Sequence, residues 1–125
     1  MSTHKHTPGP WKFGKELTAR SVEWLVSFDA GSKGRGIAIA ETCAGSGNED
    51  ANARLIAAAP ELLEACQTFA EWLRREEAGF PAETRFNTPE GEAKWREWFD
   101  ENFRICDLAQ KQARAAIAKA TGGEA

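Results

Sequence analysis

The sequence predicts an α+β fold class: a small three- or four-stranded antiparallel sheet followed by three helices, the last one long. The first observation is that glycine and proline separate short runs of β-forming residues in the N-terminal third of the chain. The second is that apolar residues then recur every three or four positions to the end, as on one face of a helix. A length of 125 residues suits one domain with its own hydrophobic core. We expect a single domain, 1–125, with a mobile tail (1–7), a sheet part (8–45), a helical part (46–120) and a frayed tail (121–125).

Three segments of the sheet part are predicted to be strands. Trp11 to Phe13 follows a proline-rich turn, and Val22 to Phe28 places alternate residues on opposite faces. Gly36 to Thr42 places two isoleucines on one face, and the connector Asp29 to Arg35 has the glycines of a hairpin loop. Because two strands alone are marginally stable, we expect the sheet to pack against helices.

The helical part begins with a start signal, since Ser46 and Glu49 match the spacing of a capping box. A short helix is predicted over residues 51–58, and Pro60 then disfavours its continuation while suiting the first turn of a second helix, 60–77. We therefore expect a tight elbow between two helices. The stripe predicted to be buried on the second helix consists of Leu62, Cys66, Phe69 and Leu73.

The last helix is predicted over residues 89–120, where Thr88 and Pro89 supply a cap and a first-turn proline. A helix of about 30 residues is about 45 Å long, which exceeds what so small a domain covers. The helix is therefore expected either to break near Asn102 or to pack partly on something else. Because apolar residues occupy more than half of its circumference, we expect a homodimer that forms through it.

Five Trp and seven Phe with no Tyr is an unusual aromatic composition. In one interpretation the aromatic residues of the last helix are core, because Trp95, Phe99 and Phe103 recur at i, i+4 and i+8 and would face Trp11 and Trp24 of the sheet.

In the other interpretation, part of this helix is a surface that binds a partner. Trp98 points roughly 60° to 100° away from the aromatic stripe, and Trp is enriched at interface hot spots. The candidate partner-binding residues are Trp98, Glu97, Glu101 and Ile105.

Composition and charge exclude several classes of protein. The 42% hydrophobic and 28% charged content is typical of a soluble globular protein. The net charge is −3, so the clustered Lys and Arg of a nucleic-acid-binding protein are missing and no direct nucleic-acid contact is expected. No apolar run approaches the ~20 residues that span a bilayer, and the first residues lack the apolar core of a signal peptide. We expect a cytoplasmic protein without membrane contact.

The residues that carry catalytic or metal chemistry are too few for an enzyme site. Both histidines, His4 and His6, fall in the expected tail, so serines, cysteines and paired carboxylates have no histidine partner in the domain. The cysteines are three, an odd number, which argues against a disulfide framework; they are Cys43, Cys66 and Cys106. We expect no catalytic residue, no metal site, no cofactor and no enzyme activity.

One basic loop remains a candidate for binding an anion. Residues 31–36 place Lys33 and Arg35 among glycines, but the motif of a nucleotide-binding loop requires Lys followed by Ser or Thr and then a helix. A solvated hairpin tip is the simpler interpretation. Lys33 and Arg35 stay as alternative contacts for a ligand or another anion.

Two segments, HTPGPW at residues 6–11 and NARLIAAAPELLEAC at residues 52–66, carry a resemblance. The chain resembles small uncharacterised proteins of bacteriophages and prophages that combine an N-terminal TPGPW turn with an NARLIAAAPELL helical segment. The resemblance implies a phage origin, and therefore the cytoplasm of a bacterial host.

The function expected from these observations is non-enzymatic. A small phage protein of this kind would bind a host protein complex and inhibit it by steric masking, with bacterial immune machinery such as a CRISPR effector as the expected target. An alternative is a protein that sequesters a nucleotide signal of host defence through Lys33, Arg35 and stacked Trp. A third hypothesis, a weak DNA-binding accessory protein, is disfavoured by the charge.

Overall fold

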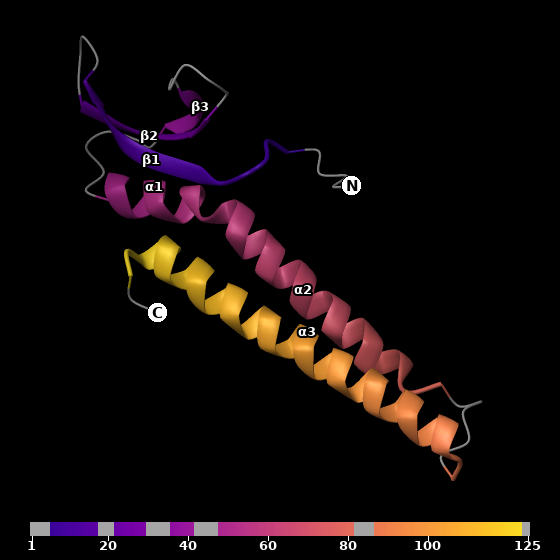
Figure 1. Ribbon diagram of the computed structural model, residues 1–125. Helices are drawn as coiled ribbons and strands as arrows, with labels where there is room; N and C mark the ends of the chain where they lie inside the picture. Colours follow the sequence, from indigo (N-terminus) through magenta and orange to yellow (C-terminus); the bar gives the residue numbers. More distant parts are fainter. Residues whose placement is uncertain (1–5, 18–21, 30–35, 42–47, 82–86, 124–125) are drawn as a thin grey trace.

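A computed structural model describes residues 6–17, 22–29, 36–41, 48–81 and 87–123 of the chain. Three strands precede three helices along the chain (Figure 1). Their bounds are β1 (Trp11–Leu17), β2 (Val22–Asp29), β3 (Gly36–Glu41), α1 (Glu49–Ala57), α2 (Ala59–Ala78) and α3 (Pro89–Thr121).

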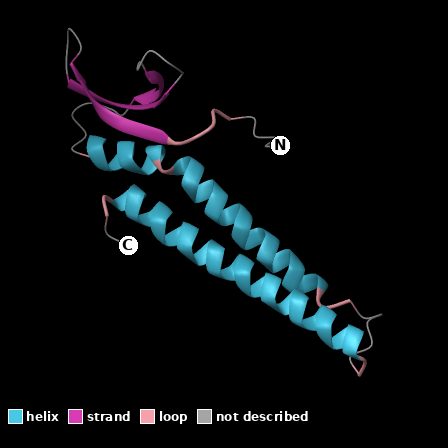
Figure 2. Cartoon of the chain, viewed as in Figure 1, coloured by secondary structure: helices cyan, strands magenta, loops and turns pink. Residues whose placement is uncertain are grey.

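The structure corrects the expected fold class, because the described chain is mostly helical and is not built around a sheet. The helices have 9, 20 and 33 residues, whereas the strands have 7, 8 and 6. Most of α2 and α3 extends beyond the strands as a separate hairpin (Figure 2). No fourth strand occurs in the segments that the structure describes. The physical reason is that α2 and α3 pack along each other through a seam of mostly small residues, so most of the hairpin does not lie on the sheet.

The strands pair in sequence order. β1 pairs with β2 in antiparallel register from Trp11 opposite Phe28 to Leu17 opposite Val22. β2 pairs with β3 in the same sense, with an irregularity between Val26 and Ser27. β1 extends four residues beyond the predicted segment, because the continuous ladder with β2 satisfies its backbone groups.

Helix α1 connects the strands to the helical hairpin. Ala53 and Ala57 are completely buried, and Trp11, Phe13 and Ile56 pack against them. The small alanine side chains let α1 approach β1 closely. Because alanine has no polar side-chain atom, its burial leaves no hydrogen-bonding group without a partner. α1 also contacts α3, so it lies between the strands and the end of the last helix.

The predicted elbow between the first two helices is confirmed. α1 ends at Ala57, α2 begins at Ala59, and Pro60 lies in the first turn of α2. The chain changes direction there (Figure 1). The predicted cap of α1 is different, because Asn48 holds the N-cap position without a side-chain hydrogen bond, and Ser46 lies outside the described residues.

The predicted start of the last helix is confirmed in atomic detail. Thr88 is the N-cap, and its hydroxyl accepts a 3.0 Å hydrogen bond from the backbone N–H of Gly91. The helix then runs unbroken for 33 residues and packs along α2. Of the two alternatives for so long a helix, the break near Asn102 is wrong, because α3 is continuous and packs along α2.

Helices α2 and α3 form an antiparallel hairpin whose contact follows a seam with a spacing of alternately three and four residues. The predicted buried stripe of α2 is wrong: Phe69 and Leu73 are 50% and 38% exposed, and Cys66 is exposed. The residues that face the seam are on average smaller than those of the predicted stripe and allow closer approach of the two axes. The buried residues of α2 and α3 that follow this spacing are Ala65, Asn102, Ile105, Ala109 and Ala116.

The aromatic residues of α3 do not face the strands. Trp95 stacks on Phe99 with ring centroids 5.2 Å apart, while Phe99 and Phe103 are 49% and 69% exposed. They lie in the half of α3 that is remote from the strands (Figure 1). The core interpretation that placed these rings against Trp11 is therefore wrong, because the hairpin carries them away from the sheet.

Candidate functional site

The predicted partner-binding residues of α3 do not form one surface. Ile105 is only 8% exposed and belongs to the seam with α2. Trp98 is half-buried and meets the ring of Phe80 edge to face, with centroids 5.9 Å apart. Trp98 therefore helps to hold the segment that follows α2 against α3. Glu97 and Glu101 lie on the outer side of α3 and are accessible.

These carboxylates belong to a surface of mixed charge, which we call the acidic flank. It consists of Ala93, Arg96, Glu97, Asp100, Glu101 and Arg104. Three carboxylates and two guanidinium groups make this surface less acidic than the sequence prediction assumed. Leu108, one helical period further on, is 39% exposed on the same side of α3.

Electrostatic pairing within the acidic flank is local. Arg104 donates from Nε to the Glu101 carboxylate over 2.9 Å. This hydrogen bond lowers the pKa of Glu101 from its ordinary value; desolvation opposes the shift, and the charges of Arg104 and Arg75 add to it. Arg96 forms an ion pair of 3.0 Å with Glu92. Glu101 thus forms an ion pair with Arg104 on an accessible surface.

The alternative anion contacts, Lys33 and Arg35, lie outside the described residues, as does Cys43. Within the segments that the structure describes, no group of three or more His, Cys, Asp or Glu could hold a metal ion. In the same segments, none of the helices is long and apolar enough to cross a membrane.

A feature that the sequence prediction missed is an apolar groove along one side of the hairpin, with a volume of about 650 Å³. Its lining contains no charged side chain. The residues that line it are Leu62, Ala65, Cys66, Phe69, Trp72, Cys106, Ala109, Gln110, Ala113 and Ile117. The signal in the sequence was the stripe that begins at Leu62, which was assigned to the core. We call this surface the apolar groove.

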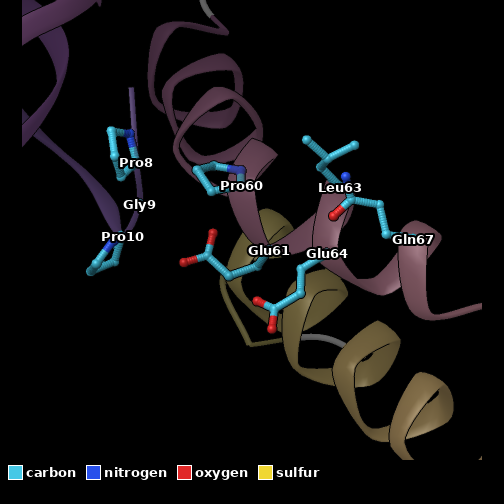
Figure 3. A pocket seen from close by; sticks show the side chains of 8 residues that line it. All are labelled: Pro8, Gly9, Pro10, Pro60, Glu61, Leu63, Glu64 and Gln67. Atoms are coloured by element: carbon cyan, nitrogen blue, oxygen red, sulfur yellow. The ribbon is translucent and has the colours of Figure 1, made fainter. Parts of the chain in front are cut away.

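A smaller hollow of about 400 Å³ lies where the N-terminal turn meets the start of α2 (Figure 3). Pro8 and Pro10 face Pro60 and Glu61 across it. Gly9 lies so close to the Pro60 ring that a β-carbon on Gly9 would come within 2.7 Å of Pro60 Cβ. The two segments that carried the sequence resemblance therefore contact each other in space.

We call the contact between the N-terminal turn and the start of α2 the junction. Lys119 connects it to the end of α3. Its ammonium group donates to the backbone carbonyl of Trp11 over 2.8 Å and to the Glu61 carboxylate over 2.7 Å. The Trp11 indole N–H donates to the Thr7 carbonyl over 3.1 Å. These contacts join β1, α2 and α3, so the junction has a structural explanation as the point where three elements meet.

Comparison with protein families gives one match. A family model described as Salmonella phage P22 protein Y8K6 matches residues 1–124 of the chain. Neither the curated proteins nor the solved structures contain a significant match. The match covers the junction, the acidic flank and the apolar groove alike.

Proposed function

Because the chain belongs to the family of Salmonella phage P22 protein Y8K6, we propose that it is a non-enzymatic phage protein that binds a host protein complex and inhibits it by steric masking. The target class that we propose is bacterial immune machinery, such as a CRISPR effector complex. The family match supports only the phage origin. The target class is inferred from the accessible carboxylates of the hairpin, which suit a host protein with a basic surface.

The observation that carries the proposal is the acidic flank on the outer side of the hairpin. Glu97 and Asp100 are exposed on a helix that projects away from the strands (Figure 2). A host surface that binds nucleic acid is rich in Lys and Arg, and carboxylates complement it. Leu108, on the same side of α3, adds apolar area that excludes water from such a contact.

The shape of the hairpin suits a steric mechanism. A helix of 33 residues is about 50 Å long, which is enough to cover a groove that holds nucleic acid or a docking site for a subunit. Inhibition then needs only occupancy, because the bound hairpin excludes the competing ligand. The rigid helical frame keeps the entropic cost of binding low, since few backbone angles are immobilised on association.

The test is inhibition of purified CRISPR effector complexes by the wild-type protein and by charge-reversal variants. Glu97→Lys with Glu101→Lys should slow association and abolish inhibition without loss of helicity, because exposed charges contribute little to stability. The matched control is Glu71→Lys with Glu77→Lys on α2. Each variant changes two glutamates to lysine, so the two variants have equal net charge. Each pair also contains one carboxylate that is ion-paired with an arginine three residues further on.

The control variant should inhibit like the wild type. Equal inhibition by both variants would remove the acidic flank from the mechanism, and the absence of any inhibition or binding would contradict the proposed target class. Loss of activity only in Lys33→Glu with Arg35→Glu, together with a thermal shift by cyclic or adenine nucleotides, would instead favour sequestration of a nucleotide.

A further inference from the structure

We propose that the apolar groove binds a second copy of this chain, so that two α2–α3 hairpins pack face to face as a four-helix bundle. This inference does not depend on the proposed function, because the acidic flank and the apolar groove lie on different sides of the hairpin. Glu101 and Phe103 are about 160° apart around the axis of α3. A dimer through the apolar groove therefore leaves the acidic flank accessible.

The first argument is that each helix carries a second stripe with the period of a coiled coil. Positions separated by alternately four and three residues keep to one face along the whole helix, and they are the contact positions of coiled coils and most four-helix bundles. The stripe on α2 is Leu62, Cys66, Phe69 and Leu73. The stripe on α3 is Phe99, Phe103, Cys106, Gln110, Ala113 and Ile117.

Part of each stripe lines the same groove: Leu62, Cys66 and Phe69 from α2, and Cys106, Gln110, Ala113 and Ile117 from α3. Phe69 from α2 and Ile117 from α3 line the groove and are 50% and 44% exposed. Phe103 continues the α3 stripe and is 69% exposed. Large apolar side chains gathered on one face are typical of an interface.

The chemistry of the groove indicates what kind of partner covers it. Its lining is uncharged, so neither a basic nor an acidic partner finds a complementary charge there. A suitable partner must present an uncharged face with the same helical period. The groove side of a second copy of the chain meets this requirement. In a two-fold symmetric dimer each copy presents the same patch to the other, as in most homo-oligomers.

The estimated size of the face reaches the minimum expected of a biological interface. The α3 stripe from Phe99 to Ile117 is about 27 Å long, and two packed helices are about 20 Å wide. Each copy would then bury at least about 500 Å² in projection, or about 1,000 Å² for the pair, which reaches the lower limit of specific interfaces.

The test is the mass of the full-length protein in solution, measured by light scattering and sedimentation over a range of concentrations. Wild type should have twice the monomer mass of 13.7 kDa. Phe69→Glu with Ile117→Glu should give the monomer mass with unchanged helicity, because both side chains are already half-exposed. The matched control, Leu55→Glu with Leu63→Glu, changes leucines that are 55% and 39% exposed outside the groove, and it should remain dimeric.

A second measurement does not depend on the folding of the glutamate variants. Cys66 and Cys106 both line the groove, so a short bifunctional thiol reagent should link two copies of Cys43→Ser covalently. Changing Cys66 and Cys106 to serine as well should abolish the link. A wild-type mass of one chain at every concentration, a dimer that persists in Phe69→Glu with Ile117→Glu, or no covalent dimer would each overturn the proposal.

Discussion

At the residue scale, the contact between Gly9 and Pro60 explains why two distant sequence segments occur together. The Gly9 backbone packs on the Pro60 ring so closely that only a hydrogen fits in place of a side chain. Pro60 at the same time starts α2. Pro60 thus forms the elbow between α1 and α2 and also packs against the N-terminal turn. A single contact therefore constrains the sequence of both the turn and the elbow.

We predict that Gly9→Ala lowers the free energy of unfolding by about 1 to 3 kcal/mol, as for other overpacked sites. The added methyl group would meet the rigid ring of Pro60, which cannot rotate away. Chemical denaturation followed by circular dichroism measures the change. A midpoint equal to that of the wild type would show that the turn moves freely away from α2.

A second prediction at this scale concerns the Glu101 carboxylate. Because the hydrogen bond from Arg104 lowers its pKa, Arg104→Ala should raise this pKa toward the ordinary value, which an NMR titration of the side-chain carboxyl would show. In the wild type the paired carboxylate stabilises the fold above the ordinary pKa, and this contribution is lost as the pH falls through the lowered pKa. The corresponding Glu71 and Arg74 pair on α2 should be unaffected in Arg104→Ala.

At the element scale, the seam between α2 and α3 contains a fully buried polar residue that favours one register. Asn102 is only 3% exposed, and its side chain accepts from Arg75 and donates to Glu76 over 2.9 Å. A buried polar group in a seam favours the one alignment in which its hydrogen bonds form, and the hydrogen bond from Gln112 to Glu64 across the same seam acts in the same sense. This accounts for a continuous α3 at the position where the sequence alone suggested a break.

We predict that Asn102→Ala lowers the free energy of unfolding by about 1 to 3 kcal/mol, because the Arg75 and Glu76 side chains lose their buried partner. Asn102→Leu should recover most of this loss through apolar packing but should weaken the preference for one register. Thermal unfolding measures the stability of both variants, and pairs of introduced cysteines across the seam report the register. Equal stability of Asn102→Ala and the wild type would contradict the role of Asn102.

At the scale of the whole molecule, the hairpin presents two surfaces of opposite chemistry. The acidic flank has exposed charges, whereas the apolar groove has none. The end of α3 is fastened to the strands by Lys119, so both surfaces are presented on one frame. A dimer formed through the apolar groove would carry two copies of the acidic flank. It would therefore bind with greater avidity to a target that has two sites.

We predict that salt affects the two proposed contacts in opposite directions. Binding of a basic host surface should weaken as salt rises, since exposed charges are screened within about 8 Å at physiological ionic strength. The dimer should persist or strengthen in a kosmotropic salt such as sulfate, because burial of apolar area then becomes more favourable. Titration calorimetry and sedimentation at several salt concentrations measure the two responses. Dissociation of a dimer by moderate salt would show that charges hold it.

Several elements could be predicted from the sequence because their signals are local. Thr88 and Pro89 start α3, and Pro60 separates α1 from α2, because a cap or a missing N–H acts within one turn of the chain. The junction at Gly9 could not be predicted from local rules. Its two sides are about 50 residues apart in the sequence, and only the close approach in space requires a glycine.

The sequence by itself thus determined where α2 and α3 begin, where the elbow lies, and that the helices carry more apolar residues than one seam can bury. Only the tertiary structure decided which stripe faces inward. Ala65, rather than Phe69, lies in the seam of the hairpin, since alanine lets the axes of α2 and α3 approach closely. The larger apolar residues are left on an outer face. Both stripes have the same helical period, so periodicity alone does not distinguish them, and the choice depends on the partner that each stripe meets.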